Sequence, residues 1–171
     1  NDIVLIKAKY PAIRRGVPTT ETRLMKYSLS DDKISSVFSK RTFSRFQFVP
    51  QIQSSIVDYL DNDPDHILMS ISGLSSQSQY KSVIQVSLKS GGVKLKQYAE
   101  KYIEDWITDR QHQVRIGIYR DDTSYRIYEQ PQANGDMRLL WEFEIFDENA
   151  IWPIGFDHDP NILYVNAYHQ G

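Results

Sequence analysis

The fold is decided by a stretch that occurs twice in the chain, about 47 residues apart and without a gap. The first copy reads Asp58-Tyr59-Leu60-Asp61-Asn62-Asp63-Pro64-Asp65-His66-Ile67-Leu68-Met69-Ser70-Ile71. The second reads Asp105-Trp106-Ile107-Thr108-Asp109-Arg110-Gln111-His112-Gln113-Val114-Arg115-Ile116-Gly117-Ile118. A shorter third copy follows Trp152 and spans residues 157–165. In each copy a polar turn precedes an apolar run, so the chain contains an internal repeat.

A second pair of segments repeats in the same way, with residues 23–34 matching residues 82–93. Both segments end a strand-like run in Ser-Leu and continue through an Asp- or Gly-containing turn. Val83-Ile84-Gln85-Val86-Ser87-Leu88 alternates apolar and polar residues, which is the signal of a β-strand. The turn formers between such runs include Asp63-Pro64, Gly91-Gly92 and Asn134-Gly135. These features predict an all-β fold with antiparallel strands.

The repeat unit combines four short strands in just under 50 residues, which is typical of a β-propeller blade. We therefore predict a partial β-propeller of three to four antiparallel four-stranded blades. The expected divisions are a partial blade over 1–45, blades over 46–101 and 102–148, and a partial blade over 149–171. So few blades do not close a ring, so the expectation is a fragment of one propeller domain within a longer chain. A sandwich, a barrel, or chance similarity among short strands remain as alternatives.

Two segments also fit a helix. Apolar residues from Leu95 to Ile107 recur at helical spacing, and residues 51–60 have the same ambiguity. The repeat favours strands in the second half of the 95–107 segment.

Composition excludes several classes of function. Twenty Lys and Arg against 22 Asp and Glu give a net charge of −2, which argues against a nucleic-acid binder. The chain has no Cys, so disulfides and thiolate chemistry are excluded. No apolar run is long enough to span a membrane, and no cofactor is expected. The compartment is open between cytoplasm and periplasm, with the periplasm favoured.

Two oxygen-rich segments have the spacing of a calcium loop: Asp61, Asp63 and Asp65, and Asp157, Asp159 and Asn161. The first segment lacks the Gly and the Glu that an EF-hand loop has at positions six and twelve, since His66 and Ser72 stand there. Because both fall in the repeated turn, local backbone roles are the favoured interpretation. The four histidines, His66, His112, His158 and His169, show no metal-site spacing and are interpreted as surface residues. No metal-binding residue is predicted.

Other segments have candidate binding roles. Residues 40–48 interleave Lys40, Arg41 and Arg45 with three phenylalanines, which suits base stacking or, as the favoured interpretation, packing between blades. Arg14 and Arg15, in a predicted long loop, could bind a partner domain or a peptide carboxylate, although a solvated loop is favoured. The aromatic residues Tyr59, Trp106, Trp141 and Trp152 are interpreted as packing between blades.

The second half of the chain resembles the propeller of prolyl-oligopeptidase-like serine peptidases. The likeness lies in Ile103-Glu104-Asp105-Trp106-Ile107-Thr108-Asp109, Tyr125-Arg126-Ile127-Tyr128-Glu129, Leu140-Trp141-Glu142-Phe143-Glu144 and Trp152-Pro153-Ile154-Gly155-Phe156-Asp157. It is firm over residues 102–171 and looser before them. The common Ser-Pro-Asp-Gly blade turn is replaced here by Asp63-Pro64-Asp65-His66.

The resemblance implies a non-catalytic propeller that gates the access of peptides to a C-terminal α/β-hydrolase domain. That domain would carry the nucleophile, and no G-x-S-x-G motif occurs in this chain, so no catalytic residue is assigned. The alternative is a TolB-like propeller that acts only as a protein-binding scaffold. Exposed strand edges on an open arc of blades also predict self-association.

Overall fold

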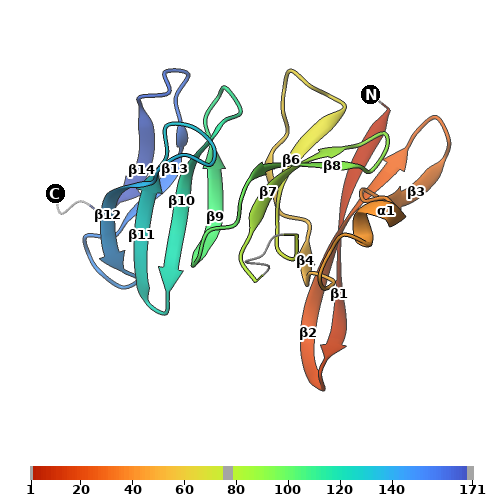
Figure 1. The fold of residues 1–171 in the computed structure, drawn as a ribbon, viewed down its shortest axis with the longest axis horizontal. Helices are drawn as coiled ribbons and strands as arrows, with labels where there is room; N and C mark the ends of the chain where they lie inside the picture. The colour runs from red at the N-terminus through yellow and green to blue at the C-terminus, as the bar shows by residue number, and fades with distance from the viewer. Residues whose placement is uncertain (1, 75–78, 169–171) are drawn as a thin grey trace.

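The chain folds into four antiparallel sheets in a computed structural model that describes residues 2–74 and 79–168 (Figure 1). The first sheet contains β1 (Ile3–Arg14), β2 (Val17–Ser28), β3 (Lys33–Ser36) and β4 (Ile52–Gln53). The second contains β5 (Ile56–Asp58), β6 (His66–Ile71), β7 (Ser82–Ser87) and β8 (Val93–Gln97). The third contains β9 (Ile103–Thr108), β10 (Val114–Asp121), β11 (Ser124–Glu129) and β12 (Arg138–Glu144). The fourth contains β13 (Ile151–Phe156) and β14 (Leu163–Ala167).

The all-β prediction is confirmed, and the second and third sheets are four-stranded meanders in sequence order. The first sheet differs, because β4 pairs with β2 in the parallel sense. Residues 52–53 therefore belong to the first sheet, although the sequence grouped them with the unit over 46–101. A short helix, α1 (Lys40–Phe43), precedes β4. In the described ranges no helix is long and apolar enough to cross a membrane.

Both segments that also fit a helix contain strands instead, as the repeat predicts for the second half of residues 95–107. Residues 93–97 form β8, residues 103–108 form β9, and the earlier segment contains β4 and β5. Tyr102, just before β9, has a φ of 64°, a left-handed conformation that interrupts any continuous helix. The helical spacing of apolar residues arises because two strands, each with a buried side, follow one another across this break.

The hairpin repeat has the same register in both copies. Met25 pairs with Ser36 in the first sheet, and the matching residues Ile84 and Leu95 pair in the second. Lys26 and Ser35 likewise match Gln85 and Lys94. The repeat read from residues 23–34 and 82–93 is therefore structural.

The gapless match of Tyr59 with Trp106 is wrong. Trp106 lies inside β9, pairs with Gly117 and is 4% exposed, whereas Tyr59 follows the end of β5 and is 63% exposed. The pairs Ile56–Met69 and Ile107–Ile116 show the reason. The second strands are offset by 47 residues and the first strands by 51. The loop over 59–65 is two residues longer than the loop over 109–113, and register shifts in both strand pairs account for the rest.

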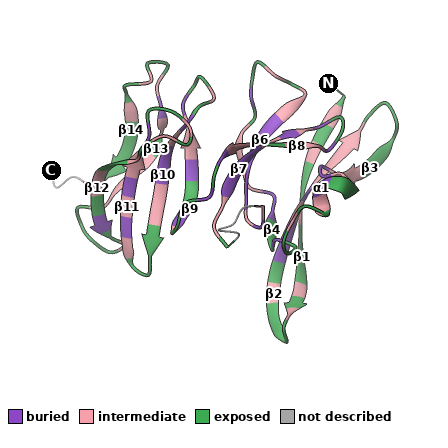
Figure 2. Cartoon of the chain, in the orientation of Figure 1, coloured by how far each residue is buried: buried purple, intermediate pink, exposed green. Residues whose placement is uncertain are grey.

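The sheets pack face to face in sequence order, and each sheet-to-sheet contact has its own apolar core (Figures 1 and 2). The first interface joins Leu24, Val37 and Phe38 of the first sheet region to Ile67, Met69, Ile71, Ile84, Val86 and Leu88. The second interface joins Leu60, Leu68 and Val83 to Ile103, Trp106 and Val114. The third interface joins Ile116, Tyr125, Ile127 and Phe143 to Phe156. The second sheet is therefore buried on both faces, as the run His66–Ile71 shows in Figure 2.

Between sheets, the first strands approach one another most closely. The Cα traces of β5 and β9, and those of β9 and β13, come within 8 Å. These three strands open the second, third and fourth sheets. Their proximity places the loops that follow them next to one another.

Candidate functional site

A cleft of about 590 Å³ lies where β5, β9 and β13 end. Its lining includes Asp58 and Asp61 from the second sheet, Arg110 and His112 from the third, and Gly155 and His158 from the fourth. These residues reach one place because their strands lie side by side. The cleft mixes acidic, basic and apolar groups, which is typical of a binding site with few fixed polar contacts.

The wall of the cleft contains a hydrogen-bonded group that joins two sheets. Asp58 Oδ2 accepts from Thr108 Oγ1 at 2.9 Å and lies 2.9 Å from His112 Nδ1. Asp58 Oδ1 accepts from the backbone N–H of Leu60 at 2.8 Å. The side chains of Asp58 and His112 are 13% and 23% exposed. Since a carboxylate only accepts, Nδ1 of His112 carries the proton in this contact.

His112 Nε2 is buried and has no hydrogen-bond partner among the residues that the structure describes. An imidazole held by an aspartate is the arrangement that orients a general base beside a nucleophile. Here the nitrogen that would accept a proton is shielded from solvent, so the pair connects sheets rather than presenting a base. The sequence does not reveal this pair, because its members stand 54 residues apart, in different repeats, with no local spacing between them.

The oxygen-rich segments serve the turns in which they lie. The Oδ1 atoms of Asp63, Asp109 and Asp159 each accept from the backbone N–H two residues later, at 3.3, 3.0 and 2.9 Å. Each also accepts at its carbonyl from the residue three positions later. Asp63 and Asp159 of the calcium-like segments thus have the local backbone roles that the turn interpretation predicts. Asp109 has the same role in the second copy of the repeat. Within residues 2–74 and 79–168, no group of three or more His, Asp or Glu is arranged to hold a metal ion.

The histidines occupy different surroundings. His66 and His112 both follow an Asp turn by three residues, but His66 contacts Asp63 of its own turn at 2.9 Å. His158 lines the cleft beside Asp157, whose pKa is held below its ordinary value by the hydroxyl of Tyr164 and by the backbone N–H of Asp159. The same contact raises the pKa of Tyr164. His169 lies outside the described residues.

Two of the three phenylalanines in residues 40–48 are packed, and one is exposed. Phe38, Phe43 and Phe46 form edge-on ring contacts, with Phe38 and Phe43 centroids 5.7 Å apart. Phe43 and Phe46 pack against the first interface, as the packing interpretation predicts, whereas Phe48 is 42% exposed. Lys40, Arg41 and Arg45 are exposed.

The predicted long loop around Arg14 and Arg15 is wrong. Arg14 ends β1, and Arg15 and Gly16 form a two-residue hairpin turn with φ values of 50° and 80°. Arg14 Nε donates to Glu21 at 2.7 Å, and its Nη1 donates to the Val49 carbonyl at 2.8 Å. The Arg14 contact, together with Arg23, holds the pKa of Glu21 below its ordinary value, against the opposing effect of burial. Arg14 thus braces the hairpin against the segment before β4.

The tryptophans lie at sheet interfaces. Trp106 belongs to the second interface and donates its indole N–H to the Lys81 carbonyl at 2.8 Å. Trp141 and Trp152 pack at the third interface, where Trp141 donates to the Ile151 carbonyl at 2.7 Å. The packing role predicted for the three tryptophans is therefore confirmed, and that of Tyr59 is not.

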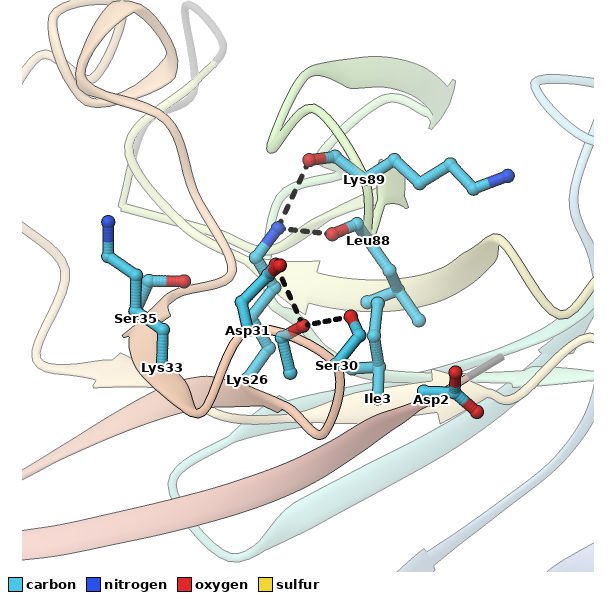
Figure 3. Close-up of a pocket in the computed structure, with 10 residues that line it drawn as sticks. Asp2, Ile3, Lys26, Ser30, Asp31, Lys33, Ser35, Leu88 and Lys89 are labelled. Carbon is cyan, nitrogen blue, oxygen red and sulfur yellow. Dashed lines mark hydrogen bonds between the residues drawn. The ribbon is translucent and has the colours of Figure 1, made fainter.

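A second cleft lies between the first sheet and the loop after β7 (Figure 3). There the ammonium of Lys26 donates to the Leu88 and Lys89 carbonyls, the latter at 3.2 Å. The hydroxyl of Ser28 contacts Ser30 and donates to Asp31 at 3.0 Å. These polar groups bond to one another or to backbone carbonyls, and the Lys26 contacts join the first sheet to the second. This cleft is therefore a weaker candidate for a binding site than the cleft at the ends of β5, β9 and β13.

Comparisons of the chain with protein-family profiles, curated protein sequences and solved structures find no match. The site is therefore interpreted from its own geometry.

Proposed function

We propose that this chain is a non-catalytic segment of a β-propeller that binds peptides in the cleft at the ends of β5, β9 and β13. The observation that carries the proposal is the approach of these three first strands. If the sheets fan out from their first strands, as blades do, those strands border the central channel. A cleft at that position is where a propeller would meet a peptide on its way through.

The lining suits a peptide chain. Gly155 has no side chain, and open space surrounds the position of its missing Cβ. Beside it, the exposed side chains of Ile154 and Tyr59 offer apolar surface. Asp61 and Arg110 lie in the same lining and provide opposite charges. Apolar contacts with a few polar groups that fix orientation are typical of such sites.

The link to a peptidase is part of the proposal and rests on the resemblance of residues 102–171 to prolyl-oligopeptidase-like propellers. In that case the cleft gates peptide access to an α/β-hydrolase domain of the parent chain. A TolB-like scaffold would use the same cleft for protein binding alone. A G-x-S-x-G motif followed by Asp and His downstream in the parent gene favours the peptidase, and its absence favours the scaffold.

Amide NMR of the isotope-labelled chain, titrated with capped octapeptides of mixed sequence, tests binding in the cleft. We expect shifts at Gly155 and in the 109–112 turn, and their loss in Gly155→Arg, where the long side chain occupies the cleft without a backbone clash. Val17→Arg is the matched control, because Val17 is 63% exposed at the hairpin end. Absence of shifts at millimolar peptide, or equal binding by Gly155→Arg, would contradict the proposal.

A further inference from the structure

The hairpin of β1 and β2 projects beyond the rest of the molecule, as Figure 1 shows. Among the residues that the structure describes, β3 pairs with β2 only over residues 25–28, and β4 pairs with it only over 22–23. Residues 10–21 therefore form a two-stranded ribbon, which ends at the turn of Arg15 and Gly16. The ribbon belongs to none of the three apolar cores of the described chain.

Four large apolar side chains are exposed around this turn. Ile13 and Val17 flank it and are 75% and 63% exposed. Arg14 donates to the Val49 carbonyl at 2.8 Å and lines one pocket together with Phe48, so Phe48 and Val49 lie near the turn. They are 42% and 53% exposed. We call Ile13, Val17, Phe48 and Val49 the hairpin tip, and apolar side chains gathered in this way mark an interaction surface.

Positive charge accompanies the hairpin tip. Residues 7–23 contain five Lys and Arg and one acidic residue, Glu21, which is bonded to Arg14 and Arg23 at 2.7 and 2.6 Å. The other acidic residues of the first sheet lie at its opposite end, before β1 and between β2 and β3. This end of the first sheet is therefore basic, although the chain as a whole is not. Its partner should be anionic as well as apolar.

The surface of an anionic membrane combines these two properties, because charged headgroups lie directly above hydrocarbon. At ~3.4 Å per residue, Lys9 lies about 14 Å behind Ile13 along β1. A tip that enters ~5–10 Å below the headgroup boundary leaves Lys9 at the level of the headgroups. Arg15 stands at the turn itself, and its long side chain can reach back to the phosphates while its stem stays in the apolar layer.

Other anionic partners fit the hairpin tip less well. Nucleic acid is bound through cations and stacked aromatic rings, whereas three of the four side chains of the tip are aliphatic. A projecting turn also offers a protein partner only part of the ~800 Å² that a stable interface buries on each side. A membrane needs no such area of matched surface, because lipid adapts its shape to what enters it.

We propose that the hairpin tip holds this chain on the surface of membranes that contain anionic lipids. The apolar side chains of the tip lie below the headgroups, and the cations of the hairpin lie among them. Such a peripheral contact requires no spanning segment. It is separate from the cleft at the ends of β5, β9 and β13, which the first sheet does not line.

Co-sedimentation with lipid vesicles tests the proposal. We expect at least tenfold tighter binding to phosphatidylcholine vesicles with about 30% phosphatidylserine than to phosphatidylcholine alone, and weaker binding as salt rises. Arg15→Gln should weaken binding about fivefold, which is the contribution of one cation near an anionic surface. Ile13→Gln should weaken it about tenfold or more. Phe146→Gln is the matched control, because Phe146 is 89% exposed between β12 and β13. No binding, equal binding to both kinds of vesicle, or unchanged binding of Ile13→Gln would overturn the proposal.

A fluorescent label tests whether the hairpin tip enters the lipid. The chain has no Cys, so Ile13→Cys and Phe146→Cys each supply a single site for an environment-sensitive dye. On anionic vesicles, we expect the emission to shift to the blue for the dye at position 13 and to stay unchanged for the dye at position 146. An equal shift with polyglutamate or with a DNA oligonucleotide would identify an acidic protein or a nucleic acid as the partner and would refute membrane binding.

Discussion

Asp58 shows how one side chain can connect two sheets. Its carboxylate accepts from Leu60 in its own loop and from Thr108 and His112 in the third sheet. Asp63 makes the corresponding contact with a histidine only inside its own turn, and its side chain is 42% exposed. Both aspartates contact a histidine, but only the Asp58 contact joins two sheets, because only Asp58 lies between sheets.

Asp58→Ala should lower the free energy of unfolding by roughly 2–4 kcal/mol, since three hydrogen bonds are lost and buried donors are left unpaired. Asp63→Ala, the matched control, should cost about 1 kcal/mol or less because water can replace its contacts. Urea unfolding followed by tryptophan fluorescence measures both. Equal losses in the two variants would show that Asp58 does not connect the sheets energetically.

Among the elements, the turn between β7 and β8 holds the segment around α1 against the second sheet. Gly91 has a φ of 66°, which favours glycine. Its carbonyl accepts from the backbone N–H of Ser39 at 3.0 Å and from the Thr42 hydroxyl at 2.7 Å. A Cβ on Gly91 would lie 2.5 Å from the Ser39 nitrogen. Position 91 therefore needs glycine for its left-handed backbone conformation, and also because a side chain there would clash with the backbone of Ser39.

Gly91→Ala should cost about 3 kcal/mol or more, because a backbone clash adds to the ~1–2 kcal/mol of left-handed strain. Gly16→Ala carries similar strain at a φ of 80° but meets nothing within 4 Å, so it should cost only about 1–2 kcal/mol. Urea midpoints of the two variants give the comparison. A Gly91→Ala chain as stable as Gly16→Ala would mean that the α1 segment moves aside freely.

The elements also show what the sequence could predict. The hairpin register of residues 23–34 and 82–93 was readable because both copies have equal turns and the same alternation. The gapless alignment of the first strands is wrong because the loop in the second sheet is two residues longer and both strand pairs contain register shifts. The contact between Asp58 and His112 was beyond sequence reasoning, since it depends on how two sheets pack rather than on either repeat alone.

At the scale of the whole molecule, the sheets contact their neighbours in sequence order through three separate cores. Stability in such a stack is approximately a sum of the units and their nearest-neighbour interfaces. The second interface, around Trp106, divides the molecule into two pairs of sheets. Each pair retains its own core, so weakening this interface should uncouple the halves before it unfolds either one.

Trp106→Ala removes a large buried side chain from that interface and should cost about 3–5 kcal/mol. The linker between β8 and β9, with exposed Lys101, should then open. Limited trypsin digestion should cut Trp106→Ala at Lys101 into two folded halves, while the unmodified chain resists. Trp152→Ala weakens only the third interface, so its cleavage at Lys101 should stay slow. Rapid digestion of Trp106→Ala to small peptides would show instead that the stack unfolds as one cooperative unit.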